Sequence, residues 1–241
     1  MNIDFTCMQC VKEKLEEQQR FIFEMRDDNI YKIQCNHGHE NIIIFQHHKF
    51  EILYDMGIYA MLDGYFREAV SNFASSLERF YEFSIEIFST KNNVDLKEYE
   101  KAWNIISKQS ERQLGAYIML YLNTFLGPPN LLSTKYIEFR NEVTHKGKIP
   151  SSKETYEYAE AVFNFIKDKL VEIKNSYNDI LIFVYEKALR NYIIKNDVNN
   201  KNLISWGELM TFNSIRPVDE IGLKDFNQVI EQCKNYKPFK K

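Results

Sequence analysis

Apolar side chains recur every three to four residues along most of the chain, which is the spacing of an amphipathic α-helix. Over residues 50–63 this stripe consists of Phe50, Leu53, Tyr54, Ile58 and Met61. The same spacing predicts further helices over residues 65–88, 96–125, 131–144, 151–170 and 177–194. We therefore expect a mostly α protein in which these helices pack against one another.

Turn and capping residues separate the predicted helices. The Gly-Pro-Pro run at 127–129 ends the helix over 96–125, because proline cannot continue the hydrogen-bond ladder. Asp95 can cap the start of that helix, and Ser151 with Glu154 has the spacing of a capping box. These signals predict distinct helices joined by short loops.

Residues 1–46 follow a different pattern, in which short apolar segments lie between clusters of cysteine and histidine. The segments 21–23, 30–33 and 41–46 have the composition and length of short β-strands. We expect a small N-terminal β-ribbon here.

The cysteines and histidines of this ribbon have the spacing of a zinc site. Cys7 and Cys10 form a CxxC pair, and Cys35 begins a CxxxH. A small ribbon usually binds tetrahedral Zn²⁺ with two ligands on each of two tight turns. We predict a structural zinc ion held by Cys7, Cys10, Cys35 and His39, with His37 as the alternative fourth ligand. The other interpretation is that these are free buried cysteines with incidental histidines.

The patterns divide the chain into three parts. We expect a zinc-ribbon-like element over residues 1–46, a helical bundle over 47–195, and a small C-terminal subdomain or arm over 196–241. An asparagine-rich stretch at 191–202 has the composition of a linker. The last part contains no recognisable chemical motif.

Composition limits the classes of function. A net charge of −3 gives no overall attraction to nucleic acid, so an RNA contact would require a local basic patch. No apolar run reaches the roughly 18 residues of a membrane span, and the N-terminus lacks a signal-peptide layout. Four cysteines do not form a disulfide scaffold in a chain of 241 residues. We expect a cytoplasmic protein without a membrane partner.

A polar cluster lies in the segment FRNEVTHKG at 139–147, where a predicted helix ends. Asn141 and His145 are four residues apart and share a helix face, which the long side chain of Arg140 can also reach. His145 is the only histidine after position 48, so histidine-dependent acid–base chemistry in the helical part would require it. Such residues near a helix C-terminus can also simply cap carbonyls and favour the helix dipole.

The segment from Arg140 to His145 resembles the motif of the HEPN family, in which four residues separate an arginine from a histidine at the end of a helix. Asn141 stands at the position after the arginine, where a polar residue is common in the family. The resemblance covers roughly residues 50–175. It implies an up-and-down HEPN-like helical bundle, here preceded by the zinc-ribbon element.

Many HEPN proteins are metal-independent ribonucleases that act as homodimers, often as toxins or phage-defence effectors. The resemblance implies that Arg140 binds the phosphate, that His145 acts as acid or base, and that Asn141 orients them, with no cofactor for catalysis. Glu78 resembles the acidic residue that some members place beside the arginine and histidine. RNA is the expected substrate, because its 2′-hydroxyl can attack the phosphate.

Two lysines follow the motif, and the resemblance also implies partners. Lys146 and Lys148 add the local positive charge that RNA requires. An antitoxin or another defence-system protein is an expected partner, although the tyrosine that some antitoxin-controlled members carry after the histidine is replaced by HKGK. One alternative is a non-catalytic HEPN-like dimerisation or interaction module that docks through its zinc ribbon. Another is a nucleic-acid-binding zinc-ribbon regulator, which the modest basic content of residues 1–40 does not favour.

Overall fold

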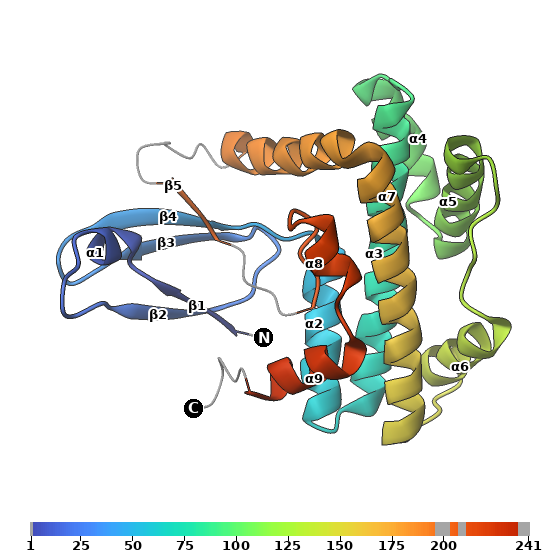
Figure 1. Cartoon of the computed structure of the whole chain (residues 1–241), viewed down its shortest axis with the longest axis horizontal. Helices are drawn as coiled ribbons and strands as arrows, with labels where there is room; N and C mark the ends of the chain where they lie inside the picture. The colour runs from blue at the N-terminus through green and yellow to red at the C-terminus, as the bar shows by residue number, and fades with distance from the viewer. Residues whose placement is uncertain (1, 196–202, 207–210, 236–241) are drawn as a thin grey trace. The chain divides into compact units, whose positions relative to one another are not determined.

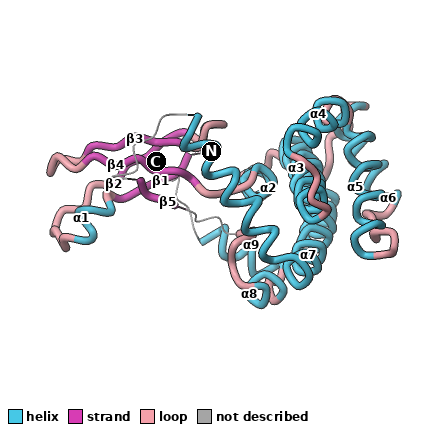
Figure 2. The backbone as a smooth tube through the Cα atoms, turned by 90° about the horizontal axis from the view of Figure 1, so that it is seen from above, coloured by secondary structure: helices cyan, strands magenta, loops and turns pink. Residues whose placement is uncertain are grey.

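The computed structural model of the protein describes residues 2–195, 203–206 and 211–235. These residues are mostly helical, as the apolar pattern predicts. Figure 2 distinguishes the strands, in magenta, from the helices, in cyan. No helix among the described residues combines the length and apolar character needed to cross a membrane.

The described residues form two compact units. The strand unit consists of described residues from Met1–His47 and Tyr185–Glu208, and the helical unit of those from His48–Val184 and Leu209–Lys234. Of the predicted C-terminal part, residues 203–206 join the strand unit and residues 211–234 join the helical unit. Residues 196–202, 207–210 and 236–241, which include most of the predicted linker at 191–202, lie outside the described residues.

The strand unit contains two small sheets (Figure 1). Antiparallel strands β1 (Asn2–Thr6) and β2 (Arg20–Glu24) form one sheet, and the short helix α1 (Met8–Lys12) follows β1. The second sheet has the order β3 (Ile30–Gln34), β4 (Glu40–Phe45) and β5 (Leu203–Trp206). The strands predicted from the apolar segments are β2, β3 and β4.

Strands β1 and β5 were not indicated by the local sequence. β5 runs parallel to β4, with Ile42 opposite Leu203, so its pairing depends on residues far apart in the chain. On the same unit, Leu189 and Ile193 pack against the buried Ile30 and Ile44. This small apolar cluster stabilises the three-stranded sheet.

The helical unit is built around α3, which contacts α2, α5 and α6. Its helices are α2 (Lys49–Leu62), α3 (Phe66–Lys91), α4 (Leu96–Ile106), α5 (Ser110–Phe125), α6 (Thr134–His145), α7 (Ser152–Lys195), α8 (Val218–Gly222) and α9 (Phe226–Asn235). α7 passes into the strand unit at Tyr185. The core of the helical unit is strongly aromatic, with fully buried Phe50, Tyr54, Phe73, Phe80, Phe163 and Phe212.

Close packing of α2 on α3 depends on Gly57. A Cβ atom at this position would lie 2.5 Å from the ring of Phe73. Ile58, the next residue, is fully buried in the same core. The two helices therefore approach more closely than larger side chains would allow.

One predicted helix was wrong in extent, and another predicted division is confirmed. The helix expected over 96–125 breaks into α4 and α5, because Gln109 is extended, and Gln113 donates a hydrogen bond to the Ser107 carbonyl that the break leaves open. The helices expected over 151–170 and 177–194 are the two parts of α7, which meet at a kink where Tyr177 has a non-helical backbone, as the predicted start of the second helix requires. The predicted caps are confirmed: Asp95 accepts hydrogen bonds at the start of α4, and Ser151 and Glu154 bond reciprocally.

A buried polar clamp, formed by Glu51 and Asp55 of α2, holds the segment Thr211–Ser214. A Glu51 carboxylate oxygen accepts the Ser214 backbone N–H at 2.6 Å, and Asp55 accepts the Thr211 N–H at 3.2 Å. The ammonium group of Lys174 donates to the Ser214 carbonyl at 2.6 Å, and burial lowers its pKa. This clamp was not predicted, because its partners lie about 160 residues apart along the chain.

Candidate functional site

Four predicted metal ligands gather in the strand unit. The ligand atoms of Cys7, Cys10, Cys35 and His39 all lie within 4.8 Å of one another. Cys7 precedes α1 and Cys10 lies within it, whereas Cys35 and His39 flank the turn between β3 and β4. That turn closes through a hydrogen bond from the Cys35 N–H to the His39 carbonyl at 3.0 Å.

The distances within this cluster fit a tetrahedral ion. Zinc–sulfur bonds of about 2.3 Å and zinc–nitrogen bonds of about 2.0 Å place tetrahedral ligand atoms about 3.5–3.8 Å apart. The Cys10 and Cys35 sulfurs are 3.6 Å apart. The Nδ1 atom of His39 lies 3.3–3.8 Å from the three sulfurs. These four side chains could therefore hold a metal ion such as zinc.

His39, rather than His37, completes the cluster. The Nδ1 atom of His37 lies 3.5 Å from the Cys10 sulfur, but its side chain is exposed and it is not part of the mutually close set. Gly38 adopts a φ of +81°, which is favourable for glycine and turns the chain between the two histidines. The structure thus distinguishes the two alternatives that the spacing left open.

The electrostatic surroundings favour a bound cation. Burial alone would raise the pKa of the Cys35 thiol, but backbone groups of His39 and His37 stabilise its thiolate and bring its pKa down to about 6. Burial and the neighbouring thiols raise the pKa of Cys10 to about 12. Three thiolates at this spacing repel one another, so a cation is needed for all of them to ionise together.

Two polar side chains support the cluster from outside. The Nε2 atom of His39 lies 3.3 Å from the Glu13 carboxylate, so its Nδ1 atom is left to face the sulfurs. The Asn41 amide donates to the Cys7 sulfur at 3.4 Å. Neither contact was predicted from the sequence, since neither residue belongs to the ligand motif.

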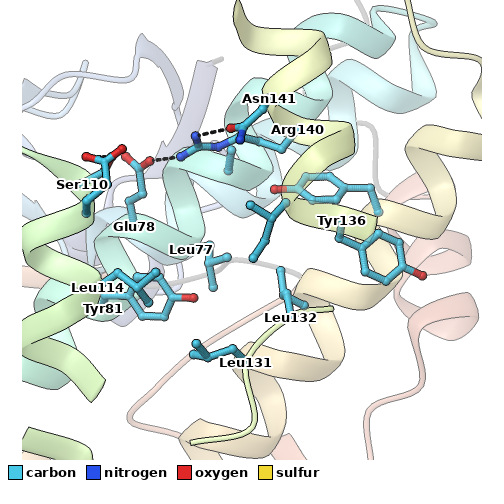
Figure 3. A pocket seen from close by; sticks show the side chains of 14 residues that line it. Leu77, Glu78, Tyr81, Ser110, Leu114, Leu131, Leu132, Tyr136, Arg140 and Asn141 are labelled. Carbon is cyan, nitrogen blue, oxygen red and sulfur yellow. Dashed lines mark hydrogen bonds and ion pairs between the residues drawn. The ribbon is translucent and has the colours of Figure 1, made fainter. Parts of the chain in front are cut away.

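The polar motif occupies the last turns of α6, which ends at His145, and Gly147 follows with a φ of +73°, as expected for a glycine just beyond a helix end. The guanidinium of Arg140 donates to Glu78 of α3 at 2.5 Å and to the Asn141 side-chain oxygen at 3.0 Å (Figure 3). The structure therefore brings together three of the four predicted catalytic residues.

These three side chains line one end of a cavity of about 300 Å³. The rest of its lining is mostly apolar or aromatic (Figure 3) and comes from α3, α5, α6, α7 and the segment before α6. Its lining includes Leu77, Tyr81, Leu114, Leu132, Tyr136 and Tyr158. The cavity is thus an apolar space with a charged, hydrogen-bonded end.

The chain was compared with protein-family models, with curated proteins and with solved structures. None of them matches. The HEPN resemblance stays a prediction that depends on the motif from Arg140 to His145.

His145, the fourth predicted catalytic residue, lies apart from the cavity lining. Its side chain is exposed in the last turn of α6. Arg140 and His145 are five residues apart, which on a helix of 3.6 residues per turn separates their directions by about 140°. Within one chain, the arginine and the histidine therefore project from different sides of α6.

The two predicted RNA-binding lysines differ in their surroundings. Lys148 is 3.0 Å from both Glu142 and Glu154, and its ammonium group lies 5.0 Å from the centre of the Phe139 ring. Hydrogen bonds to Glu154 and Glu142 raise its pKa. Lys146 is exposed and forms no ion pair with any residue that the structure describes. Lys146 is therefore the one whose charge is not locally compensated.

The aromatic residues that line the cavity were not predicted from the sequence as part of a site. Tyr81 lies three residues after Glu78 on α3, so helical spacing places both on neighbouring positions of one face. That spacing was a usable signal. Tyr158 gives no comparable signal, because only the packing of α7 brings it to the cavity.

Proposed function

We propose that the chain is a metal-independent endoribonuclease of the HEPN type that acts as a toxin or phage-defence effector. RNA would be cleaved by attack of the 2′-hydroxyl on the adjacent phosphate, at a site formed between two copies of the chain. The observation that carries this proposal is the Arg140 guanidinium, held by Glu78 and Asn141 at the end of a cavity.

Arg140 has the properties of a phosphate-binding group. A guanidinium has five N–H donors, and two hydrogen bonds are made here, to Glu78 and Asn141. The side chain is 24% exposed, so the other donors remain open to a ligand. Because its two contacts fix the guanidinium plane beforehand, little reorganisation is needed when charge develops on the phosphate.

His145 has the accessibility that a shared site requires. In-line cleavage of RNA uses a base for the 2′-hydroxyl and an acid for the leaving 5′-oxygen, and one chain offers one histidine in this region. Two copies of α6 meeting near their C-terminal ends would supply two histidines and two arginines. Self-association is therefore part of the proposal.

The metal cluster has a separate, structural role in this proposal. Cys7, Cys10, Cys35 and His39 supply the four ligands of a tetrahedral zinc ion, which would stabilise the fold of the strand unit. With four protein ligands, no coordination position is left for a substrate. RNA cleavage would then depend on the side chains of the helical unit alone.

The test is RNA cleavage by the zinc-loaded protein in a buffer without added magnesium or other free divalent cations. We expect products with 2′,3′-cyclic phosphate and 5′-hydroxyl ends, identified by mass spectrometry. His145→Ala should slow cleavage by about 100-fold or more, since it removes the acid–base group. Lys97→Ala, which changes an exposed residue of α4 outside the cavity lining, is the control and should cleave at close to the wild-type rate. Equal rates for wild type and His145→Ala would contradict the proposal.

One observation favours a second candidate, a non-catalytic HEPN-like dimerisation module. The ion pair between Arg140 and Glu78 joins α6 to α3, and so also serves the packing of the helical unit. For this candidate, measurement of the solution mass would give a dimer, while the wild-type protein would leave RNA intact in the cleavage assay.

A further inference from the structure

The cavity beside Arg140 extends well beyond the atoms that would contact a phosphate. We propose that it binds one unstacked nucleobase of the RNA, next to the phosphate that Arg140 holds, and thereby sets the base preference of cleavage. This inference rests on the proposed ribonuclease function. The base would occupy the rest of the cavity, because the polar motif of α6 lines only one end of it.

The size and lining of the cavity suit a base. Its volume of about 300 Å³ lies at the lower end of the range for small-molecule sites. Leu77, Leu114 and Leu132 give it apolar walls, and Tyr81, Tyr136 and Tyr158 add aromatic rings. Flat bases stack on such rings whatever their sequence, and single-stranded RNA is commonly recognised in this way.

Two tyrosines that line this cavity have hydroxyl groups available for hydrogen bonds to a ligand. Tyr81 is 7% exposed and Tyr158 2% exposed, and both line the cavity. Neither hydroxyl has a hydrogen-bond partner among the residues that the structure describes. Among the described residues, the fully buried side-chain oxygens without a partner lie elsewhere, so these two hydroxyls are open to the cavity and can donate to or accept from a ligand that enters it.

The charged end gives the ligand its orientation. Arg140 and Asn141 lie at one end of the cavity, with Glu78 beside them (Figure 3). Burial raises the pKa of both Tyr81 and Tyr158, so their hydroxyls stay protonated and can donate as well as accept. A nucleotide with its phosphate at Arg140 would direct its base toward these hydroxyls. An apolar ligand without an anionic group would leave the arginine unused.

The first experiment measures binding of the four nucleoside 3′-monophosphates to the full chain by titration calorimetry. We expect at least one of them to bind, and Leu132→Trp, which fills the cavity, to weaken that binding by about 10-fold or more. Leu126→Trp is the matched control, because Leu126 precedes α6 in the same connection but is 89% exposed and does not line the cavity. Equal binding by wild type and Leu132→Trp, or no binding by wild type, would overturn the inference.

Two conservative Tyr→Phe substitutions test nucleotide binding with little effect on folding. Tyr81→Phe removes one cavity hydroxyl, and we expect it to weaken nucleotide binding about 5-fold. Tyr117→Phe is the control, because the Tyr117 hydroxyl is unpaired too but is fully buried, and Tyr117 does not line the cavity. If both variants weaken binding equally, the cavity hydroxyl has no special role and the inference is wrong.

The second experiment separates this inference from the proposed function. Cleavage of RNAs that differ only in the base beside the cut site should show a preference in the wild type that Leu132→Trp reduces. RNA cleavage with an unchanged preference in Leu132→Trp would overturn the base site but leave the ribonuclease intact. Nucleotide binding that Leu132→Trp abolishes, in a protein that cleaves no RNA, would support the base site and contradict the ribonuclease.

Discussion

The metal cluster of the strand unit and the arginine site of the helical unit, formed by Arg140, Asn141 and Glu78, are both polar. They differ in how many of their donor and acceptor atoms already have a partner. In the metal cluster, three buried sulfurs and a histidine nitrogen face one another, and Glu13 and Asn41 support them from outside. At the arginine site, Arg140 makes two hydrogen bonds and faces a cavity of about 300 Å³.

This difference distinguishes a structural site from a site that binds a ligand. A closed cluster with a complete set of ligands stabilises a fold, because every donor atom already has its place. An oriented charge that retains open donors beside an apolar cavity is suited to bind something from solution. The following changes should therefore affect stability at the metal cluster and at the buried clamp, and activity at the arginine site.

The largest expected effect on stability comes from the metal ligands. Cys10→Ser should abolish binding of one zinc per chain, and structural zinc sites contribute on the order of 10 kcal/mol to small folds. Metal analysis and limited proteolysis would show loss of zinc and cleavage within the strand unit. Cys233→Ser is the control, because Cys233 is buried in the helical unit outside the cluster. Full zinc content in Cys10→Ser would rule out this ligand set.

The next largest expected effect on stability is at the buried clamp. Its polar groups pair with one another, as those of the metal cluster do, but it contains no metal ligands. Glu51 is 0% exposed and accepts the backbone N–H groups of His48 and Ser214. Glu51→Ala should lower the free energy of unfolding by about 3–5 kcal/mol, since it leaves both N–H groups without their acceptor at a buried position. Chemical denaturation would measure this change.

An exposed glutamate serves as the control for the clamp. Glu68, on the outer face of α3, is exposed, and Glu68→Ala should change the free energy of unfolding by about 0.5 kcal/mol or less. A similar change for Glu51→Ala would show that the clamp does not hold the segment Thr211–Ser214 to α2.

How much of the fold and of the site can be predicted from the sequence depends on how close together in the chain the residues of each feature lie. The helices are encoded by apolar spacing within each segment, and the caps at Asp95 and Ser151 by neighbouring residues. The metal ligands were also found, because cysteine and histidine at ligand spacing have few other uses. These predictions needed no knowledge of the tertiary fold.

Features that join distant segments could not be found in the same way. The pairing of β4 with β5 and the contact between Glu51 and Ser214 each join residues about 160 positions apart. The cavity likewise depends on how α3, α5, α6 and α7 pack. Glu78 was proposed from a family resemblance, and the structure places it beside Arg140.

The smallest expected effect concerns the capping box at the start of α7, close to the motif. The backbone and hydroxyl of Ser151, followed by Lys148, lower the pKa of Glu154 from its usual 4.5 to about 2. A lowered carboxyl pKa stabilises the fold fully above the usual value, and this contribution is lost as the pH falls from 4.5 toward 2. Glu154→Gln should therefore lower the Tm by a few degrees at neutral pH.

The pH dependence of this variant distinguishes the charge of Glu154 from its packing. The difference in Tm between wild type and Glu154→Gln should shrink below pH 4.5. Glu100→Gln, at an exposed position of α4, is the control and should show little difference at any pH. A constant difference for Glu154→Gln down to pH 2 would contradict the assigned pKa.

The most direct test of the central claim compares two arginines of the helical unit. Arg140 and Arg79 are similarly exposed, at 24% and 30%, and each pairs with a glutamate, but Arg79 does not line the cavity. At saturating RNA, Arg140→Ala should slow cleavage by about 100- to 1,000-fold, as expected for loss of a preorganised charge-stabilising donor. Arg79→Ala should stay close to the wild-type rate. Equal rates for Arg140→Ala and Arg79→Ala would contradict the assignment of the Arg140 site as the place where RNA is cleaved.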